Sequence, residues 1–409
     1  MSPLMRYLNA SMKNFIIISP HFPPTYYQFA KALKNNGFRV LGVGDASFFE
    51  LSPELRNALD EYYCCYDMEN YDNEKRAVEC FRNKYGIIDY LESNNEYWLE
   101  RDSWLRNDFN IPNGVRPDEL KYWQHKSMMK ELYKKAGAKV ADYILVENEE
   151  QVLAFANKVG YPIFAKPDIG VGASDDYKLE NSDDVHEFFN KKDPNVTYIC
   201  EQFVNGNIVS FDGICDEESN VVFCASNVFP PSVADVVREG KDLFYYTVKE
   251  VPEDLKEIGS KVIKAFNVKK RFFHLEFFRL TKNVKGVGKV NDIVALETNM
   301  RPAGGFTPDL INFSQSVNSY QIYADVIAFN ENRQDMDLPK YFAACASRRD
   351  WVGYKNDDNA ILEKYKNNIC NSGRYPDVLS GAMGNRFFMA KFETIEEINE
   401  FQEYCEARN

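Results

Sequence analysis

Residues 296–305 read LETNMRPAGG, and this segment carries the strongest signal in the chain. Side chains alternate between the two faces of an extended strand, so Glu297, Asn299 and Arg301 share one face. A carboxylate, an amide and a guanidinium together pack poorly in a core, but they suit a divalent cation and a phosphoryl group. Hard cations such as Mg²⁺ prefer oxygen ligands, and arginine offers a planar fork of donors to phosphoryl oxygens. A strand edge blunted by charge is the alternative interpretation.

A second acidic residue upstream strengthens the hypothesis of a cation site. In residues 272–278, FFHLEFF, Glu276 interrupts an aromatic strand. An isolated buried carboxylate is costly unless it is paired or bound to a metal. We therefore expect Glu276 and Glu297 to face each other from neighbouring strands, joined by a hairpin or loop at 282–288. His274 shares a face with Glu276 and is expected to be a hydrogen-bonded structural residue.

Two further segments suggest an anion site. Residues 162–167, PIFAKP, predict an apolar strand that stops at Lys166, because the following proline favours extended geometry. The loop GVGAS at 170–174 follows, and the amide groups of such a loop can wrap an anion. A solvated lysine before a flexible loop is the alternative. Residues 199–206, ICEQFVNG, predict a strand that runs into a turn, and the prediction for Lys126 is a mid-helix position, where most lysines are solvated.

Composition excludes several classes of protein. The 409 residues carry a net charge of −13, which argues against nucleic acid as the main partner. No apolar run approaches the ~18 residues of a membrane span, and no signal peptide is recognisable, so we expect a soluble, cytoplasmic protein without a membrane partner. The nine cysteines are scattered and never spaced as C-x-x-C, and the motifs of zinc hydrolases, serine hydrolases and P-loop enzymes are absent.

The pattern of elements changes along the chain. Strand, helix and strand at 15–18, 27–36 and 39–43 predict a parallel α/β layer, and the turn-rich residues 111–117 predict a boundary. The next helix is expected to run from 117 to 136. From residue 161 onward the chain reads as α+β, with strands expected at 161–167, 197–204, 208–215, 220–226, 271–280 and 292–299.

In this order, the segments between residues 118 and 315 resemble the ATP-grasp superfamily, most closely its carboxylate–amine ligases. The resemblance implies a fold of the α/β and α+β classes, with an N-terminal parallel α/β domain, a small lid domain and a C-terminal ATP-grasp domain. The implied boundaries are 1–115 for the N-terminal domain, 116–204 for the lid, 205–335 for the large subdomain and 336–409 for a C-terminal lobe.

The resemblance also implies a role for each matching residue. The residues implied to bind ATP are Lys126, Lys166, Ser174, Glu201, Gln202, Phe203 and Val204. Residues 201–204 match the hinge of this superfamily. In many relatives an acidic residue just after the hinge binds the ribose, but this chain has Gly206-Asn207-Ile208 there. Asp212 is therefore the substitute that we consider for binding ribose. The residues implied to hold one or two Mg²⁺ ions, or Mn²⁺ instead, are Glu276, Glu297 and Asn299. Arg301 is implied to be catalytic, because it would stabilise the acyl-phosphate step.

The implied chemistry is an ADP-forming ligation. A substrate carboxylate attacks the γ-phosphate of ATP, and an amine then displaces phosphate from the acyl phosphate to form an amide. Small carboxylates and amines are therefore the expected partners, and a homodimer is common in the resembled group. Arg238 is a candidate contact for the substrate carboxylate. Two alternatives stay open: an ATP-binding regulatory module without turnover, and an enzyme that activates bicarbonate.

Overall fold

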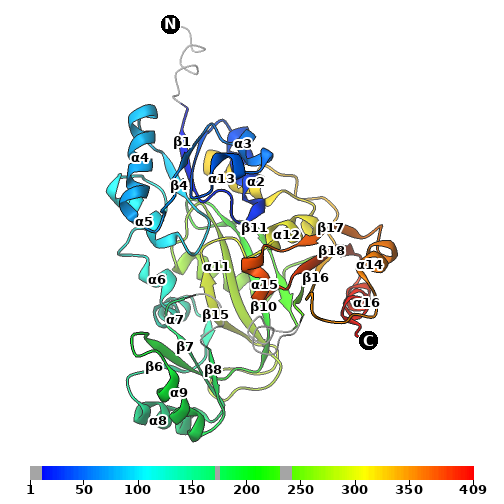
Figure 1. The fold of residues 1–409 in the computed structure, drawn as a ribbon. Helices are drawn as coiled ribbons and strands as arrows, with labels where there is room; N and C mark the ends of the chain where they lie inside the picture. The colour runs from blue at the N-terminus through cyan, green and yellow to red at the C-terminus, as the bar shows by residue number, and fades with distance from the viewer. Residues whose placement is uncertain (1–11, 171–175, 231–241) are drawn as a thin grey trace. The chain divides into compact units, whose positions relative to one another are not determined.

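A computed structural model describes residues 12–170, 176–230 and 242–409 (Figure 1). The chain forms two units, Met1–Leu120 with Asn318–Gln334 and Lys121–Val317 with Asp335–Asn409. The first boundary follows closely on the turn-rich segment noted in the sequence. The predictions for Ser174 and Arg238 lie outside the described residues.

The first unit contains a parallel sheet in the order β3-β2-β1-β4. Its strands are β1 (Asn14–Ile18), β2 (Arg39–Gly44), β3 (Glu61–Cys64) and β4 (Tyr90–Glu92). Its helices are η1 (Pro24–Tyr26), α2 (Tyr27–Asn35), η2 (Phe48–Glu50), α3 (Pro53–Ala58), α4 (Tyr71–Tyr85), α5 (Leu99–Asp108) and α13 (Ser319–Phe329). Every residue of β1 is buried, as expected for a central parallel strand covered on both faces.

Helix α13 belongs to the first unit although it lies far along the chain. The ring of Phe29 on α2 packs edge-on against Tyr320 and Tyr323, with centroid distances of 4.8 and 5.2 Å. The amide of Asn36 donates to Asp325 at 2.9 Å. The sequence-based boundaries assigned this helix to the large subdomain, because nothing local in its sequence reveals which unit it packs against.

The second unit contains two sheets. Within the described residues, the larger has ten strands in the order β17-β18-β16-β13-β12-β10-β14-β15-β5, with β11 also paired to β10, and the smaller has the order β6-β9-β7-β8. The strands are β5 (Lys139–Val140), β6 (Tyr143–Leu145), β7 (Ile163–Pro167), β8 (Tyr177–Leu179), β9 (Tyr198–Gln202), β10 (Gly206–Cys215), β11 (Val221–Ala225), β12 (Asn227–Phe229), β13 (Phe244–Thr247), β14 (Arg271–Leu280), β15 (Ile293–Asn299), β16 (Phe342–Arg348), β17 (Ile369–Arg374) and β18 (Arg386–Phe392). The strands that we predicted from the sequence are therefore present. The predicted C-terminal lobe contributes three strands, β16, β17 and β18, and these extend the same large sheet.

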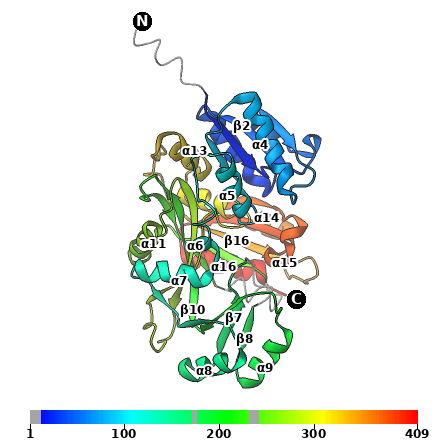
Figure 2. The same ribbon diagram turned by 90° about the vertical axis from the view of Figure 1, so that its left-hand side faces the viewer.

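The helices of the second unit cover these sheets. They are α6 (Lys121–Gln124), α7 (Lys126–Lys135), α8 (Glu149–Val159), α9 (Ser182–Lys191), α11 (Glu253–Ala265), α12 (Thr307–Gln315), α14 (Asp358–Lys364), η3 (Asp377–Leu379), α15 (Ser380–Met383) and α16 (Ile395–Glu406). Figure 2 shows α8 and α9 beside β7 and β8, and their apolar faces share one buried cluster with β7 and β9. None of the helices in the described ranges has the length and apolar character that crossing a membrane requires.

The single helix predicted for 117–136 is wrong. The backbone of His125 is extended, with φ −82° and ψ 114°, and it separates α6 from α7. Asp168, which is distant in sequence, causes this break: its main-chain carbonyl accepts from the N–H of Lys126 and its carboxylate accepts from the N–H of Ser127, both at 2.8 Å. Lys126 therefore begins a helix instead of lying in the middle of one.

Candidate functional site

Two acidic residues face each other across neighbouring strands of the large sheet. In the antiparallel register of β14 and β15, Glu276 pairs with Glu297 and His274 pairs with Asn299. Directly paired residues point to the same face of a sheet, so all four side chains lie on one face. Both glutamate side chains keep 22% of their surface exposed. The sheet thus brings together Glu276, Glu297 and Asn299, as we expected from strand alternation.

This set of donors suits a magnesium ion. Two carboxylates and one amide oxygen are hard ligands, and Mg²⁺ commonly takes one or two carboxylates and completes its shell with water and substrate phosphate. The described residues contain no group of three or more His, Cys, Asp and Glu side chains placed to hold a metal. A cation at this position would therefore depend on Asn299 and on oxygens from outside the protein, which matches magnesium better than zinc.

His274 connects the pair of glutamates to a buried polar row. Its Nδ1 lies 2.5 Å from Asp212 Oδ1 and its Nε2 lies 3.2 Å from Glu276 Oε1. Burial alone would lower the pKa of His274, but Asp212 and Glu276 outweigh burial and raise it to about 10. Burial would raise the pKa of Glu276, but the hydrogen bond from His274 contributes to lowering it. His274 is thus the hydrogen-bonded residue that the sequence predicted.

Asp212 has a structural environment that does not suit a ribose ligand. It is 3% exposed, and its Oδ1 faces His274. Its Oδ2 accepts from the amide of Asn227 at 2.8 Å and from the hydroxyl of Ser210. The structure does not support our sequence-based role for Asp212, because both of its oxygens are occupied within the protein. The sequence did not reveal that His274 is its cross-strand partner.

Three lysines gather near these acidic residues. Lys126 Nζ lies 3.5 Å from Glu297 Oε1 and donates to the carbonyl of Gly170 at 2.8 Å. Lys166 Nζ lies 3.3 Å from Glu201 Oε1. Lys130, which the sequence analysis missed, lies 3.1 Å from the same oxygen. Its place one helical turn after Lys126 puts both on one face of α7, the one signal that could have identified it.

Asp176 is a further acid that the sequence analysis did not select. Burial raises the pKa of Asp176 to about 6, although the charges of Lys166 and Lys126 oppose this rise. Its position directly follows residues 171–175, which the structure does not describe. A carboxylate here, close to two lysines, adds to the mixed-charge surface expected where a polyphosphate and its cation meet.

The hinge, residues 201–204, spans the end of β9 and the two residues after it. Val204 packs in an apolar cluster with Ala141 and Leu280. Gln202 is 8% exposed, and its Nε2 donates to the carbonyl of Lys285 at 3.1 Å. Its buried Oε1 has no hydrogen-bond partner in the described structure. Phe203 lies under the ammonium group of Lys178, at 5.5 Å from the ring centroid. The unsatisfied oxygen of Gln202 is compatible with a polar ligand at this hinge.

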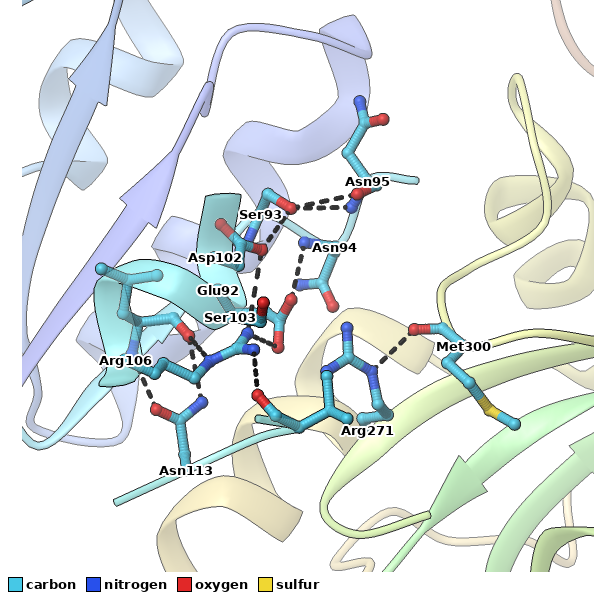
Figure 3. Close-up of polar contacts among 12 residues, drawn as sticks. Glu92, Ser93, Asn94, Asn95, Asp102, Ser103, Arg106, Asn113, Arg271 and Met300 are labelled. Atoms are coloured by element: carbon cyan, nitrogen blue, oxygen red, sulfur yellow. Dashed lines mark hydrogen bonds and ion pairs between the residues drawn. The ribbon is translucent and has the colours of Figure 1, made fainter. Parts of the chain in front are cut away.

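Arg301 lies two residues after the end of β15, and its neighbours hold its side chain. Its guanidinium donates to the carbonyl of Pro302 at 2.9 Å and to Asn299 Oδ1 at 3.4 Å. The buried Arg271 fixes the preceding peptide, because its Nε donates to the carbonyl of Met300 at 2.6 Å (Figure 3). Arg271 in turn stacks over Trp123 at 5.2 Å. The segment that carries Arg301 is therefore fixed from two sides.

The first unit has its own buried polar cluster, at the carboxyl end of β4 (Figure 3). The guanidinium of Arg106 pairs with Glu92 at 2.8 Å and donates to the carbonyl of Leu91 at 3.0 Å. Asp102 accepts from the hydroxyl and the N–H of Ser93. Burial and Glu92 raise the pKa of Asp102 to about 7. Carboxyl ends of parallel strands often carry ligand sites, but the sequence analysis did not identify this cluster.

No protein-family model matches this chain. The L-arginine-specific L-amino acid ligase of Bacillus subtilis is 21% identical over 255 residues, which are 61% of this chain and 60% of that ligase. The match therefore spans about three fifths of the length of the curated relative.

Solved structures resemble the chain over nearly its whole length. An L-amino acid ligase from Bacillus licheniformis superposes with a TM-score of 0.71 at 15% identity, covering 96% of both chains. The biotin carboxylase domain of the Hydrogenobacter thermophilus 2-oxoglutarate carboxylase gives a TM-score of 0.70 at 13% identity, covering 97% of this chain and 89% of that one. A phosphoribosylglycinamide synthetase from Anaerococcus prevotii gives 0.66 at 14% identity, covering 96% and 97%. At these identities the similarity shows the fold.

Proposed function

We propose that this chain, which has the ATP-grasp fold, is an ADP-forming ligase that joins a carboxylate to an amine. The observation that carries the proposal is the register of β14 and β15, which opposes Glu276 to Glu297 with Asn299 beside them. Phosphoryl transfer needs positioning and neutralisation of charge more than it needs a protein nucleophile. A cation site flanked by lysines and an arginine supplies both requirements.

Each residue of the site has a role in this proposal. Glu276, Glu297 and Asn299 hold Mg²⁺, which when bound neutralises charge on the transferring phosphoryl group. Lys126 and Lys166 bind the phosphates as point charges. Arg301 offers its fork of donors to the phosphoryl oxygens as charge develops during transfer.

Main-chain groups at Gln202 and Val204 hold the adenine, with Glu201 beside its amino group. The carboxylate of the acceptor attacks the γ-phosphorus of ATP, ADP leaves, and the nitrogen of the amine then displaces phosphate from the acyl carbon. The curated relative is an amino acid ligase, so L-amino acids, arginine among them, are the substrates we propose for both positions.

Activation of bicarbonate is a second candidate, because the biotin carboxylase domain superposes almost as well as the amino acid ligase, with TM-scores of 0.70 and 0.71. Labelled bicarbonate separates the two candidates. Its incorporation into a product would favour carboxylation, whereas amide formation leaves the label in solution.

The test is a substrate screen. The purified chain is incubated with ATP, Mg²⁺ and all pairs of the standard L-amino acids, and ADP, phosphate and new dipeptide masses are measured. We expect ADP and phosphate in equal amounts, released only with certain pairs and accompanied by a dipeptide mass. Binding of Mg-ATP with no release of ADP for any acceptor, bicarbonate included, would instead indicate a regulatory module. Formation of AMP and pyrophosphate would contradict the acyl-phosphate route.

A further inference from the structure

Glu201 shares one carboxylate oxygen between two buried lysines. Its Oε1 lies 3.1 Å from Lys130 Nζ and 3.3 Å from Lys166 Nζ. The side chains of Glu201, Lys130 and Lys166 are 8%, 1% and 8% exposed. Burial would raise the pKa of Glu201, but the two lysines outweigh burial and lower it to about 2. The carboxylate is thus charged, and one negative charge faces two positive groups.

The two lysines differ in what else surrounds them. Glu297 acts on both lysines, but Lys166 also feels the negative charge of Asp176, and the pKa of Lys166 is raised although burial opposes this. Burial dominates at Lys130 and lowers its pKa. In the described structure Glu201 Oε1 has no well-formed hydrogen bond with either lysine. Lys130 is more deeply buried than Lys166. Its ammonium group lies between Glu201 and the ring of Tyr143, 5.7 Å from the centroid of that ring.

Lys166 cannot serve Glu201 and a phosphate equally well. A buried carboxylate that loses its last partner is strongly destabilised, so a lysine that leaves Glu201 must be replaced there by another cation. Lys130 is already in place at 3.1 Å. Its burial and its position on α7 give it no other acidic partner among the ion pairs of the described residues.

We propose that Lys130 is a positioning residue that keeps Glu201 paired, so that Lys166 is released to bind the phosphates of the nucleotide. This inference rests on the proposed function, because it concerns the same nucleotide site. In the free protein both lysines share Glu201. When a polyphosphate arrives, Lys166 turns to it and Lys130 alone retains the carboxylate. Without Lys130, Lys166 stays on Glu201 and phosphate binding weakens.

The test measures binding of Mg-ATP by calorimetry to the full chain, with thermal unfolding as a check of folding. Lys130→Met keeps the length of the side chain and removes its charge. We expect at least a tenfold loss of affinity for Mg-ATP in Lys130→Met and near wild-type affinity in Lys130→Arg. The matched control is Lys134→Met on the same helix, because Lys134 is half exposed and pairs with Glu131. The affinity of this variant for Mg-ATP should stay within twofold of wild type.

The decisive variant is Lys130→Met combined with Glu201→Gln. Removing the charge of Glu201 removes the need for Lys130, so the double variant should bind Mg-ATP within about threefold of Glu201→Gln alone. The comparison of the double variant with Glu201→Gln tests the inference even if Lys130→Met by itself does not fold. An additive loss in the double variant, or unchanged affinity in Lys130→Met, overturns the inference. Wild-type protein that ignores Mg-ATP would instead contradict the proposed function, so the two failures are distinguishable.

Discussion

Glu276 and Glu297 are directly paired in the antiparallel register of β14 and β15, at the point where a shift in register begins. Past this point Phe277 pairs with Ala295, so β15 contributes one extra residue, Leu296. Such bulges re-aim side chains and are common beside functional sites. Two carboxylates that face each other in this way attract a divalent cation, and in the proposed function Mg²⁺ lies beside them.

Removing one of these carboxylates should abolish most activity. We expect Glu297→Gln to lower kcat/KM by about 10²-fold or more, because the amide keeps the shape but loses the charge that holds Mg²⁺. Release of ADP across a magnesium titration measures the effect. Asp292→Asn is the control, because Asp292 precedes the same strand but pairs with Lys139. Full turnover by Glu297→Gln would remove this residue from the metal site.

Arg301→Lys tests the guanidinium fork. Lysine keeps the positive charge but cannot present two donors in one plane. We expect kcat to fall by about 10²-fold while KM for ATP changes less than threefold, since the lost interaction is made only in the transition state. Steady-state kinetics give both values. A raised KM with unchanged kcat would mean that Arg301 binds the ground state instead.

The stability of the metal-free protein should depend on pH through His274. Its pKa is raised to about 10 in the folded state, so the protonated imidazole stabilises the fold fully below about pH 6.5. This contribution is lost as the pH rises through 10. We expect the difference in unfolding free energy between wild type and His274→Gln to shrink by about 4 kcal/mol between these limits.

Urea unfolding from pH 6.5 to 10 in the presence of a chelator measures this difference. A difference that stays constant across the range would show that His274 is neutral in the folded protein, and that Asp212 and Glu276 do not hold its proton.

Gly213 on β10 should resist substitution for a steric reason. A Cβ at this position would lie 2.6 Å from the ring of Phe273 and would also clash with the carbonyl of Phe223. We expect Gly213→Ala to cost about 1–3 kcal/mol in unfolding free energy, as overpacked cores do. Gly381→Ala is the control, because its added Cβ would meet nothing within 4 Å. Chemical denaturation compares the two variants, and an equal cost would contradict the clash.

Some of this site could be predicted because its pattern is local. Strand alternation alone placed Glu297 and Asn299 on one face, and the cost of burying a lone acid pointed to Glu276. The paired register of β14 and β15 then confirmed that these residues lie together. The order of these segments also predicted the ATP-grasp fold, which the solved structures confirm.

The features that the sequence did not predict depend on contacts between segments that are distant in sequence. Lysine is usually solvated, so the spacing of Lys130 one turn after Lys126 could place it on the same helix face but could not show that it is buried beside Glu201. Asp212 looked like a free acid, because its partner His274 comes 62 residues later. The break before Lys126 is caused by Asp168, 41 residues beyond Ser127. Local propensity cannot anticipate such partners, which only the fold brings together.

The position of α13 has a practical consequence for dividing this protein into pieces. A gene fragment that stops at Leu120 would encode α2 without Tyr320 and Tyr323, and Phe29 would lose its edge-on contacts with these two rings. Such a fragment should be poorly soluble on expression. A fusion that returns Asn318–Gln334 to it through a flexible linker should behave better, because the missing helix would again shield that aromatic surface from water.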